Sequence, residues 1–545
     1  MDGAGCVKLS TVSSADRQPV PASGKPTGSR RLSVLLAMAM FVLVVDTSIM
    51  NVSITAVARD LDTSVSSIQS AIALEALVSA AFILISSKLG DLMGRKRAYI
   101  LGLLGYAIGA LAMTLTQSVT VIVIFWAIIG GLGASLLLPA MQSLIHGNFE
   151  GAAQKKTYAL VGASAAVAAA IGPLLGGFVT TYLSWRVGFL LELVIIAIVL
   201  SQSKLIVDVP FTGLRKIDTV GAILSVLGMG GVVLGILVWQ EGGEYVLLLM
   251  AVGAVALGSL AYWLVRRKRQ GKVTLIDPDL FQVANFRVGV SEMVLQQITL
   301  GGAMIALPLY LQVTLEYNAM QAGLSLAPLS LTMFAVAVLT GKKAGDRRPA
   351  SIIRMGFGLA FVGMVLVIPI IPRGESGWAL LIPLVIAGSG LGLLVSQLNN
   401  YILAPIAEER VSEAAGVNSA GQSFGLSFGL AMAGGLLLAA LSLSFIKMTE
   451  SSEVIPPADQ ELIADALEDN AQLVSTTQLE ELLADQPEAI QDEIVSINTD
   501  AGNVALQVAM LVPALACLLG FINSFRLMRL PDYKPSAAVE GLVGG

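Results

Sequence analysis

The chain has 545 residues, of which 55% are hydrophobic and 13% are charged. Ordinary soluble domains carry roughly 25% charged residues, and a soluble fold has too little interior to hide this much apolar side chain. The composition therefore excludes a set of soluble domains and indicates a chain solvated by lipid. Two cysteines and one histidine argue against a disulfide framework and a histidine-based metal centre, so we expect no metal and no other cofactor.

Predominantly apolar runs of about 20 residues, the length that crosses a bilayer as a helix, recur along the whole chain. Each run is expected to be helical, because lipid offers no hydrogen-bond partner to a free backbone amide and the runs lack the alternation of membrane barrel strands. The sequence thus predicts an all-α polytopic membrane protein with fourteen transmembrane helices. They are expected at 32–54, 68–87, 98–117, 120–144, 157–180, 187–207, 217–239, 245–265, 286–312, 322–341, 351–372, 378–400, 416–446 and 503–528.

The distribution of lysine and arginine predicts the orientation. With the N-terminal tail inside, the inner segments hold 29 of the 33 basic residues, and the outer segments hold only Arg59, Arg186, Arg373 and Lys447. Short cytoplasmic loops carry such an excess of basic residues. We therefore expect both termini in the cytoplasm. The expected location of the chain is the plasma membrane. One helix more or fewer would put the basic block 266–272 on the wrong side.

Basic linkers on both sides of the seventh and eighth expected helices suggest a 6+2+6 arrangement. The expected parts are a cytoplasmic tail 1–31, a six-helix bundle 32–207, a connector 208–272 with two extra helices, a second six-helix bundle 273–531, and a cytoplasmic tail 532–545. The second bundle includes an acidic loop, expected to be extracellular.

The acidic loop, residues 447–502, holds fourteen Asp or Glu residues and one lysine. Two of its stretches, DQELIADALEDNAQLV and QLEELLADQPEAIQDEIV, have helical apolar spacing and predict two short amphipathic helices. The simpler interpretation is a solvated cap over the last helical hairpin. The alternative is that the negative charge of the loop attracts cations and concentrates them near an outer opening.

The loop after the second expected helix reads GDLMGRKR. Its glycines permit a tight turn, and its basic residues can pair with carboxylates and hold the inner face closed. This segment resembles the signature loop of the major facilitator superfamily. A similar but weaker match, GKKAGDRR at 341–348, lies at the corresponding place in the second half. Such a repeat is expected when the two halves of a transporter arose by duplication. An inner anchor with turn glycines is the structural alternative. The resemblance implies a cytoplasmic gate motif at Gly90, Asp91, Gly94, Arg95, Lys96 and Arg97.

The fifth expected helix contains GASAAVAAAIGPLLGGFV. A proline inside a helix removes a hydrogen bond and kinks it, and small residues let another helix approach closely. The segment resembles the antiporter motif of the same superfamily and implies proton-driven export; plain helix packing is the alternative. The residues that match the motif are Gly162, Gly172, Pro173, Gly176 and Gly177.

Three shorter segments extend the resemblance through the first half and the connector: VDTSIMNVSI at 45–54, SWRVGF at 184–189 and KIDTVGAIL at 216–224. The last resembles the entry to the extra helix pair of the fourteen-helix drug:proton antiporters, and implies the major facilitator fold. Relatives usually carry an arginine, often assigned to the proton relay, at the position of Ala127. The departure implies that this chain couples differently or does not couple to protons.

Four carboxyl groups lie inside expected spans, where each charge costs about 2.5–3.5 kcal/mol on the insertion scale. We expect them to face a cavity, pair with a cation or carry a proton, unless each is a structural carboxyl bonded to a neighbouring helix. The candidates for proton coupling are Asp46, Glu75 and Glu292. The candidates for the substrate cavity are Asn51, Glu192, Gln296 and Gln297.

Together these features predict a secondary active transporter that exports lipophilic or cationic small molecules in exchange for protons by alternating access. The chain has no GxxxxGK[ST] phosphate-binding loop, so a nucleotide-driven pump is disfavoured, and no enzymatic activity is expected. The expected partners are the substrate, protons and lipid, with no nucleic acid, and we expect a monomer. Two alternatives remain open: an exporter of an endogenous lipid or secreted metabolite, and a non-transporting membrane sensor on the same scaffold.

Overall fold

The computed structural model is helical, with no strand among the residues that it describes, and confirms the predicted all-α membrane fold. Thirteen of its helices are long and apolar enough to cross a membrane. The sixth expected span forms a helix of 17 residues, about 26 Å at 1.5 Å per residue, which is close to the hydrocarbon thickness of a bilayer. The described residues are 29–149, 151–208, 218–240, 245–343, 348–374, 376–407, 410–452, 454, 477, 479–480, 483 and 487–533.

The first half of the chain forms six expected spans, one of which is built from three consecutive helical pieces. Ser29 and Ser64 cap the first two helices, because each side-chain oxygen accepts a hydrogen bond from a backbone N–H of the first turn. The helices are α1 (Arg30–Asp60), α2 (Val65–Met93), α3 (Arg95–Leu115), the span made of α4 (Val119–Val121), a π-helix (Ile122–Gly130) and α5 (Gly131–Asn148), then α6 (Gly151–Tyr182) and α7 (Trp185–Ser201), followed by a 3-10 turn (Ser203–Leu205).

The connector pair and the second half follow. The connector helices are α8 (Thr219–Gln240) and α9 (Val246–Arg269). The second half comprises a 3-10 turn (Pro278–Gln282), α10 (Ala284–Leu309) continued by a π-helix (Tyr310–Thr314), α11 (Ala319–Lys343), α12 (Pro349–Val367), a 3-10 turn (Gly377–Leu380), α13 (Leu381–Leu403), α14 (Val411–Glu450) and α17 (Glu488–Leu527).

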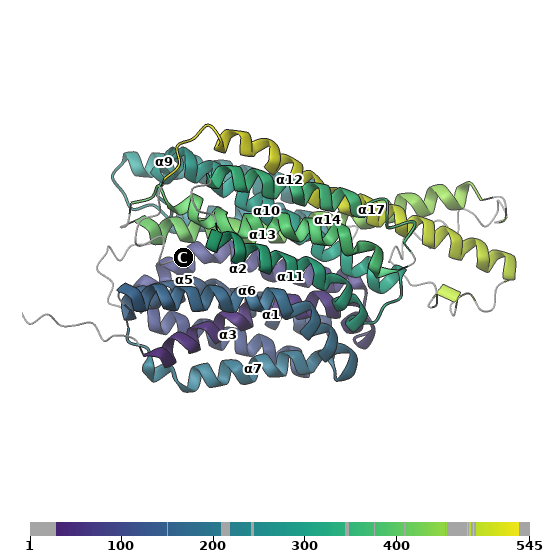
Figure 1. Cartoon of the computed structure of the whole chain (residues 1–545), viewed down its shortest axis with the longest axis horizontal. Coiled ribbons are helices and arrows are strands. Elements are labelled where there is room, and N and C mark those ends of the chain that lie inside the picture. The colour runs from purple at the N-terminus through teal and green to yellow at the C-terminus, as the bar shows by residue number, and fades with distance from the viewer. Residues whose placement is uncertain are drawn as a thin grey trace, which may run out of the picture.

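The helices of each half pack mainly among themselves. In the first half α1 packs along α6, and α3 lies against α5 and α7; in the second half α10 lies against α14 and α17, and α12 against α13. Two long contacts join the halves, α2 with α14 and α6 with α11 (Figure 1). These two contacts form the largest part of the interface between the halves. The division into domains and the orientation of the termini stay predictions.

The last two helices extend well beyond the predicted spans. Both α14 and α17 have 40 residues, about 60 Å at 1.5 Å per residue, and they project past the other helices at the right of Figure 1. The prediction of a separate short helix over QLEELLADQPEAIQDEIV was wrong for its second part, because α17 starts at Glu488 and runs on into the last span. Ile494, Ile497 and Ala501 are buried and continue the apolar face of that span without a break. The other acidic stretch, 459–474, lies outside the described residues.

Candidate functional site

Asp46 is the centre of a buried polar cluster in the first half. It lies on α1 and is 1% exposed. The Tyr106 hydroxyl, from α3, donates a hydrogen bond of 2.5 Å to Oδ2, and the Trp126 indole N–H, from the π-helix, lies 3.3 Å from Oδ1 and 3.2 Å from Oδ2. Hydrogen bonds to a charged group stabilise it by about 1.5–3 kcal/mol each. Asp46 is therefore held as a hydrogen-bond acceptor inside the protein and does not face lipid.

Glu192 of α7 lies close enough to Asp46 for the charges of the two carboxyl groups to interact. It is 2% exposed, and no N–H or O–H of the described chain reaches either of its oxygens. Phe189, one turn earlier on α7, packs edge-on against Trp126 with ring centroids 6.5 Å apart, which turns this face of α7 toward the cluster. The two carboxyl groups therefore repel each other when both are ionised.

Glu75 of α2 completes the cluster. It is half-buried, and its charge interacts with Asp46 and with the Tyr106 hydroxyl. Two like charges 4 Å apart repel each other by about 4 kcal/mol at an effective dielectric constant of 20. The structure thus brings three of the four predicted carboxyl groups together, and they cannot all be ionised without a large electrostatic cost.

The fourth carboxyl, Glu292, is fully buried in the second half on α10. Its neighbours are Asn523 of α17 and Tyr401 of α13. Because these partners belong to the second half, the structure does not bring Glu292 together with the Asp46 cluster.

The predicted cavity residues lie where α1 approaches the second half. The Asn51 side-chain N–H donates to the backbone oxygen of Thr47 at 2.7 Å and contacts the Met304 sulfur of α10 at 3.9 Å. On α10, Gln296 is buried, and no described donor reaches its Oε1. Gln297 is half-buried. The amides of Asn51 and Gln296 thus present unused hydrogen-bonding capacity inside the membrane region.

Sequence reasoning missed two groups of contact residues. Thr55 of α1 donates a hydrogen bond to Gln312 in the π-helix after α10, and so bridges the two halves. Tyr106 was missed as the closest partner of Asp46. A tyrosine in the middle of an apolar span is itself a signal, because its hydroxyl seeks a partner when buried.

The GDLMGRKR loop folds as a one-residue connection. Gly94 alone separates α2 from α3 and has φ +99°, a conformation that favours glycine. Lys96 ties this turn to the segment after α7: its backbone N–H donates to Asp208 Oδ1 at 3.0 Å and its ammonium to the Ile206 carbonyl at 2.8 Å. These contacts join the turn to the end of the first bundle, at Ile206, and to the first residue of the expected connector, Asp208. The side chain of Asp91 lies outside what the structure describes, and the gating role of the motif stays a prediction.

One face of the predicted antiporter motif packs on α1. A Cβ atom added to Gly172 would lie 2.4 Å from the Ser48 Cβ, and one added to Gly176 would lie 2.9 Å from the Ile49 Cα. Carbon atoms do not approach so closely, so only glycine allows α6 to lie this near α1 at these positions.

The other face of the motif packs on α11 across the two halves. A Cβ at Gly177 would lie 2.5 Å from the Ala319 carbonyl oxygen, and a Cβ at Gly323 of α11 would lie 2.3 Å from the Pro173 carbonyl oxygen. Gly162, in contrast, has no such neighbour within 4 Å. The motif therefore forms part of the contact between the halves, except at its first glycine.

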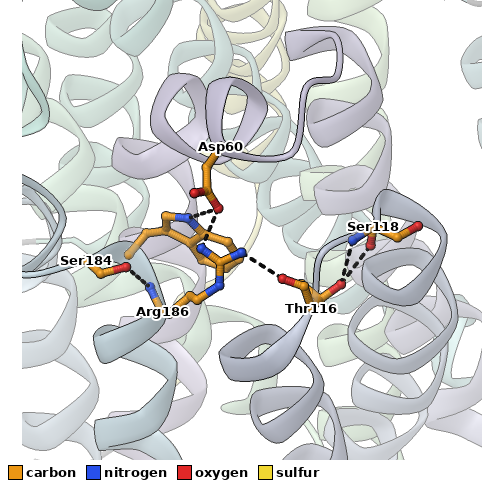
Figure 2. Close-up of polar contacts among 6 residues, drawn as sticks. Asp60, Thr116, Ser118, Ser184 and Arg186 are labelled. Atoms are coloured by element: carbon orange, nitrogen blue, oxygen red, sulfur yellow. Dashed lines mark hydrogen bonds and ion pairs between the residues drawn. The ribbon is translucent and has the colours of Figure 1, made fainter.

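The SWRVGF segment forms a polar cluster at one end of the first half (Figure 2). Arg186 pairs with Asp60 at the end of α1 and donates to the Thr116 carbonyl after α3 at 2.7 Å. Its guanidinium lies 4.4 Å from the Trp185 ring centroid, and the Trp185 indole donates to the same Asp60 oxygen at 3.2 Å. Ser184 caps α7. The cluster joins the ends of three helices.

Asp218, which the sequence placed at the entry to α8, is a structural carboxylate. Its Oδ1 accepts from the Gly221 N–H at 3.1 Å and from the Trp263 indole at 3.0 Å, and Arg267 lies 3.6 Å away. The Leu275 N–H reaches Oδ2 at 3.3 Å. Asp218 therefore fixes the connector helices to each other and to the chain that follows α9.

Asp277 fastens that following segment to the second half. It pairs with Lys268 at 2.7 Å and with Arg410, next to α14, at 3.0 Å. Partial burial opposes its charge, but the hydrogen bonds from Lys268 and the Asp279 N–H, with the charge of Arg410, lower the pKa of Asp277 below its ordinary value. The connector is thus linked electrostatically to the start of α14.

A cavity of about 220 Å³ opens between α1, α6 and α7, away from the predicted cavity residues. Its walls are almost wholly apolar, and Ser164 is the polar side chain in them. The lining residues are Val34, Ala37, Met38, Phe41, Leu160, Ser164 and Ile195. A cavity of this character suits hydrocarbon better than a charged substrate.

The sequence profile of the Major Facilitator Superfamily matches residues 36–430. The chain belongs to the Major Facilitator Superfamily. It is 27% identical over 477 residues to the probable actinorhodin transporter of Streptomyces coelicolor, with 85% of this chain and 81% of that one aligned. It is 26% identical to the multidrug export protein EmrB of Escherichia coli (79% and 84% aligned) and 25% identical to the multidrug resistance protein Stp of Mycobacterium tuberculosis (80% and 81% aligned).

Solved structures of peptide transporters share the fold of this superfamily member. An auto-inhibited POT family peptide transporter aligns with a TM-score of 0.56 at 15% identity, covering 94% of this chain and all of that chain. A POT family transporter in complex with 5-aminolevulinic acid gives the same TM-score at 14% identity, covering 90% and 98%. At this identity the likeness concerns the fold alone.

Proposed function

We propose that the protein is a secondary active transporter that exports lipophilic or cationic small molecules in exchange for protons. The observation that carries this proposal is the Asp46 cluster: three carboxyl groups held inside a membrane protein whose relatives are named for drug export and resistance. Such groups are costly in a membrane and mark ion or substrate pathways.

In the proposed mechanism the bundles 32–207 and 273–531 rock against each other at the α2–α14 and α6–α11 contacts. Proton entry from outside neutralises a buried carboxylate and releases the substrate outward. Asp46, Glu75 and Glu292 are the proposed proton carriers. Asn51, Gln296 and Gln297 are proposed to line the substrate path. The buried amide oxygens of Asn51 and Gln296 accept no hydrogen bond from the described residues and need partners that a substrate supplies.

The proposal includes a plasma-membrane location, a monomer, cytoplasmic termini and an extracellular acidic loop 447–502. The positive-inside distribution of basic residues supports this orientation. In it, the turn around Gly94 and Lys96 lies on the inner side and acts as the gate motif.

A second candidate function is the export of one endogenous compound, such as a lipid or secreted metabolite. The name of the Streptomyces coelicolor relative, a probable transporter of actinorhodin, favours it. A non-transporting sensor on the same scaffold is the third candidate. The breadth of substrates separates the first two, and the absence of any transport would support the third.

Purified protein in vesicles with an imposed pH gradient tests the proposal. A fluorescent lipophilic cation such as ethidium should move against its gradient while the pH gradient lasts, and nigericin, which collapses the gradient, should stop it. Asp46→Asn should abolish the pH dependence. Transport that continues after the pH gradient has collapsed would exclude proton coupling. Full activity of Asp46→Asn would exclude Asp46 as a proton carrier.

A further inference from the structure

A cavity that the proposed transport function does not use opens on the lipid side of the first half. It has a volume of about 220 Å³ and lies between α1, α6 and α7. Val34 of α1 and Leu160 of α6 form part of its wall and are 43% and 40% exposed. On α6 the exposed side chains recur at helical spacing on one face, at Leu160, Val167, Ile171 and Phe178. The contact of α6 with α11 uses another face. Because such an apolar stripe on a membrane helix contacts lipid, the cavity opens toward acyl chains.

Three basic residues lie at the end of the same helices. Arg30 and Arg31 of α1 and Lys156 of α6 are exposed and form no ion pair with the described residues. The Ser33 hydroxyl lies 2.8 Å from the Thr157 hydroxyl, and this hydrogen bond holds the starts of α1 and α6 side by side. The three positive charges are therefore close together, without an acidic partner in the part of the chain that the structure describes.

The cavity lies at the depth of one lipid leaflet below these charges. On α1, Arg30, Val34 and Phe41 recur at helical spacing on one face, and Arg30 and Phe41 are about 16 Å apart along the axis at 1.5 Å per residue. One leaflet of the hydrocarbon core is about 15 Å thick. On α6, Lys156 precedes Leu160 by about one turn. A phospholipid with its phosphate at these basic residues thus has its acyl chains at the height of the cavity.

The size and the chemistry of the cavity favour an acyl chain. An apolar cavity of about 150 Å³ admits a benzene molecule, so a volume of about 220 Å³ admits a length of saturated chain. The polar side chain in the wall is Ser164, and its hydroxyl donates a hydrogen bond of 2.6 Å to the Ala37 carbonyl. The wall residues therefore keep no side-chain donor for a polar ligand and present an apolar surface.

We propose that the cavity and the three basic residues form a binding site for one anionic phospholipid. The phosphate contacts Arg30, Arg31 and Lys156, and one acyl chain fills the cavity between α1, α6 and α7. Basic clusters at the ends of membrane helices bind anionic head groups, and the cavity adds a place for the chain that a flat lipid-facing surface lacks. The site is separate from the proposed substrate path, and in the proposed orientation it lies in the cytoplasmic leaflet.

Native mass spectrometry of the full chain in detergent, titrated with dioleoyl-phosphatidylglycerol, tests the site. Wild-type protein should retain one phosphatidylglycerol more tightly than phosphatidylcholine with the same acyl chains. Each basic residue near an anionic lipid contributes about fivefold in affinity. The triple variant Arg30→Gln/Arg31→Gln/Lys156→Gln should therefore weaken phosphatidylglycerol binding at least about tenfold.

Matched variants separate the charges from the cavity. Arg266→Gln/Arg269→Gln/Lys272→Gln removes three exposed charges of the same kinds at the end of α9 and should leave the affinity unchanged. Leu160→Trp keeps all the basic residues and fills the mouth of the cavity, so the acyl chain loses its packing contacts and the affinity should fall at least about fivefold. Val167→Trp, on the same face of α6 but outside the cavity wall, should have no effect.

A measurement on the wild-type protein does not depend on the folding of any variant. Phosphatidylglycerol with a photoreactive diazirine in its acyl chain should label the peptides that contain residues 34–41 and 160–164. Equal binding of the two lipids, equal losses in the two triple variants, or labelling elsewhere in the chain would overturn the site. Unchanged binding to Leu160→Trp would leave surface charge alone and overturn the role of the cavity. Displacement of the lipid by glycerol 3-phosphate would assign the basic residues to a free phosphate compound and also overturn the proposal.

Discussion

The glycine contact between α6 and α11 makes a quantitative prediction about the movement of the two halves. A Cβ atom at Gly323 would lie 2.3 Å from the Pro173 carbonyl oxygen. The two helices would have to separate locally by about 1 Å to relieve this overlap, and overpacking of this kind costs about 1–3 kcal/mol. Because the contact joins the two halves, Gly323→Ala should penalise the conformation seen here relative to one in which α6 and α11 are apart.

A penalty of about 1–3 kcal/mol lowers the population of this conformation relative to the alternative by about 5-fold to 150-fold. Gly162→Ala is the matched control, because it lies in the same motif with no neighbour within 4 Å of an added Cβ. Both substitutions gain the same helix propensity, about 0.5–1 kcal/mol. The control therefore removes that contribution from the comparison.

Disulfide cross-linking reads out the contact directly. The Met320 N–H donates to the Thr181 hydroxyl at 2.9 Å, so cysteines at 181 and 320 should cross-link on oxidation in a Cys6→Ser background. Cross-linking should be at least about fivefold slower with Gly323→Ala than with Gly162→Ala, and transport should change with it. Equal cross-linking rates would refute the close α6–α11 contact as a moving interface.

Two further predictions concern the first half. Tyr106→Phe removes the hydroxyl that donates to Asp46 at 2.5 Å. Losing this hydrogen bond to a charged group costs about 1.5–3 kcal/mol and should reduce dye transport in vesicles at least about tenfold. The control Tyr99→Phe removes a buried hydroxyl with no described partner and should leave transport unchanged. Arg186→Ala breaks the cluster of Figure 2. The loss of about 1–3 kcal/mol of folding stability should lower the melting temperature in detergent by several degrees. Arg59→Ala, at an exposed arginine, should lower it far less, and equal shifts would contradict a stabilising role for the cluster.

Most of the fold was predictable because a membrane restricts the choices. An apolar run of bilayer length has to be helical. The ends of the last hairpin were not predictable in this way, since beyond the bilayer a helix ends where packing ends. The acidic residues around Ile494 and Ile497 predicted a separate surface segment. The apolar face that includes Ile494 and Ile497 is buried, however, and α17 packs along α14 as one continuous helix.

The candidate site was predictable in composition and only partly in arrangement. Burying a carboxyl group in a membrane is costly wherever it occurs, so Asp46, Glu75 and Glu192 could be found from the sequence. Their meeting could not be found in this way, because it depends on how three helices, α1, α2 and α7, pack together. Tyr106 is 60 residues from its acceptor, and nothing local to either residue reports that distance.

The fourth span carries Ala127 where relatives usually carry an arginine, and this difference removes a fixed positive charge from the neighbourhood of the cluster. At its place Ala127 is fully buried, and the neighbouring Trp126 points its indole N–H at Asp46 from a π-helix, whose wider turn places side chains differently from an α-helix. An indole orients a carboxylate without neutralising it, whereas a guanidinium would do both. In the proposed function, a proton or a positively charged substrate supplies the counter-charge instead of a fixed cation. Introducing Ala127→Arg should therefore compete with cationic substrates while sparing neutral ones, and equal inhibition of both would argue against electrostatic competition at this site.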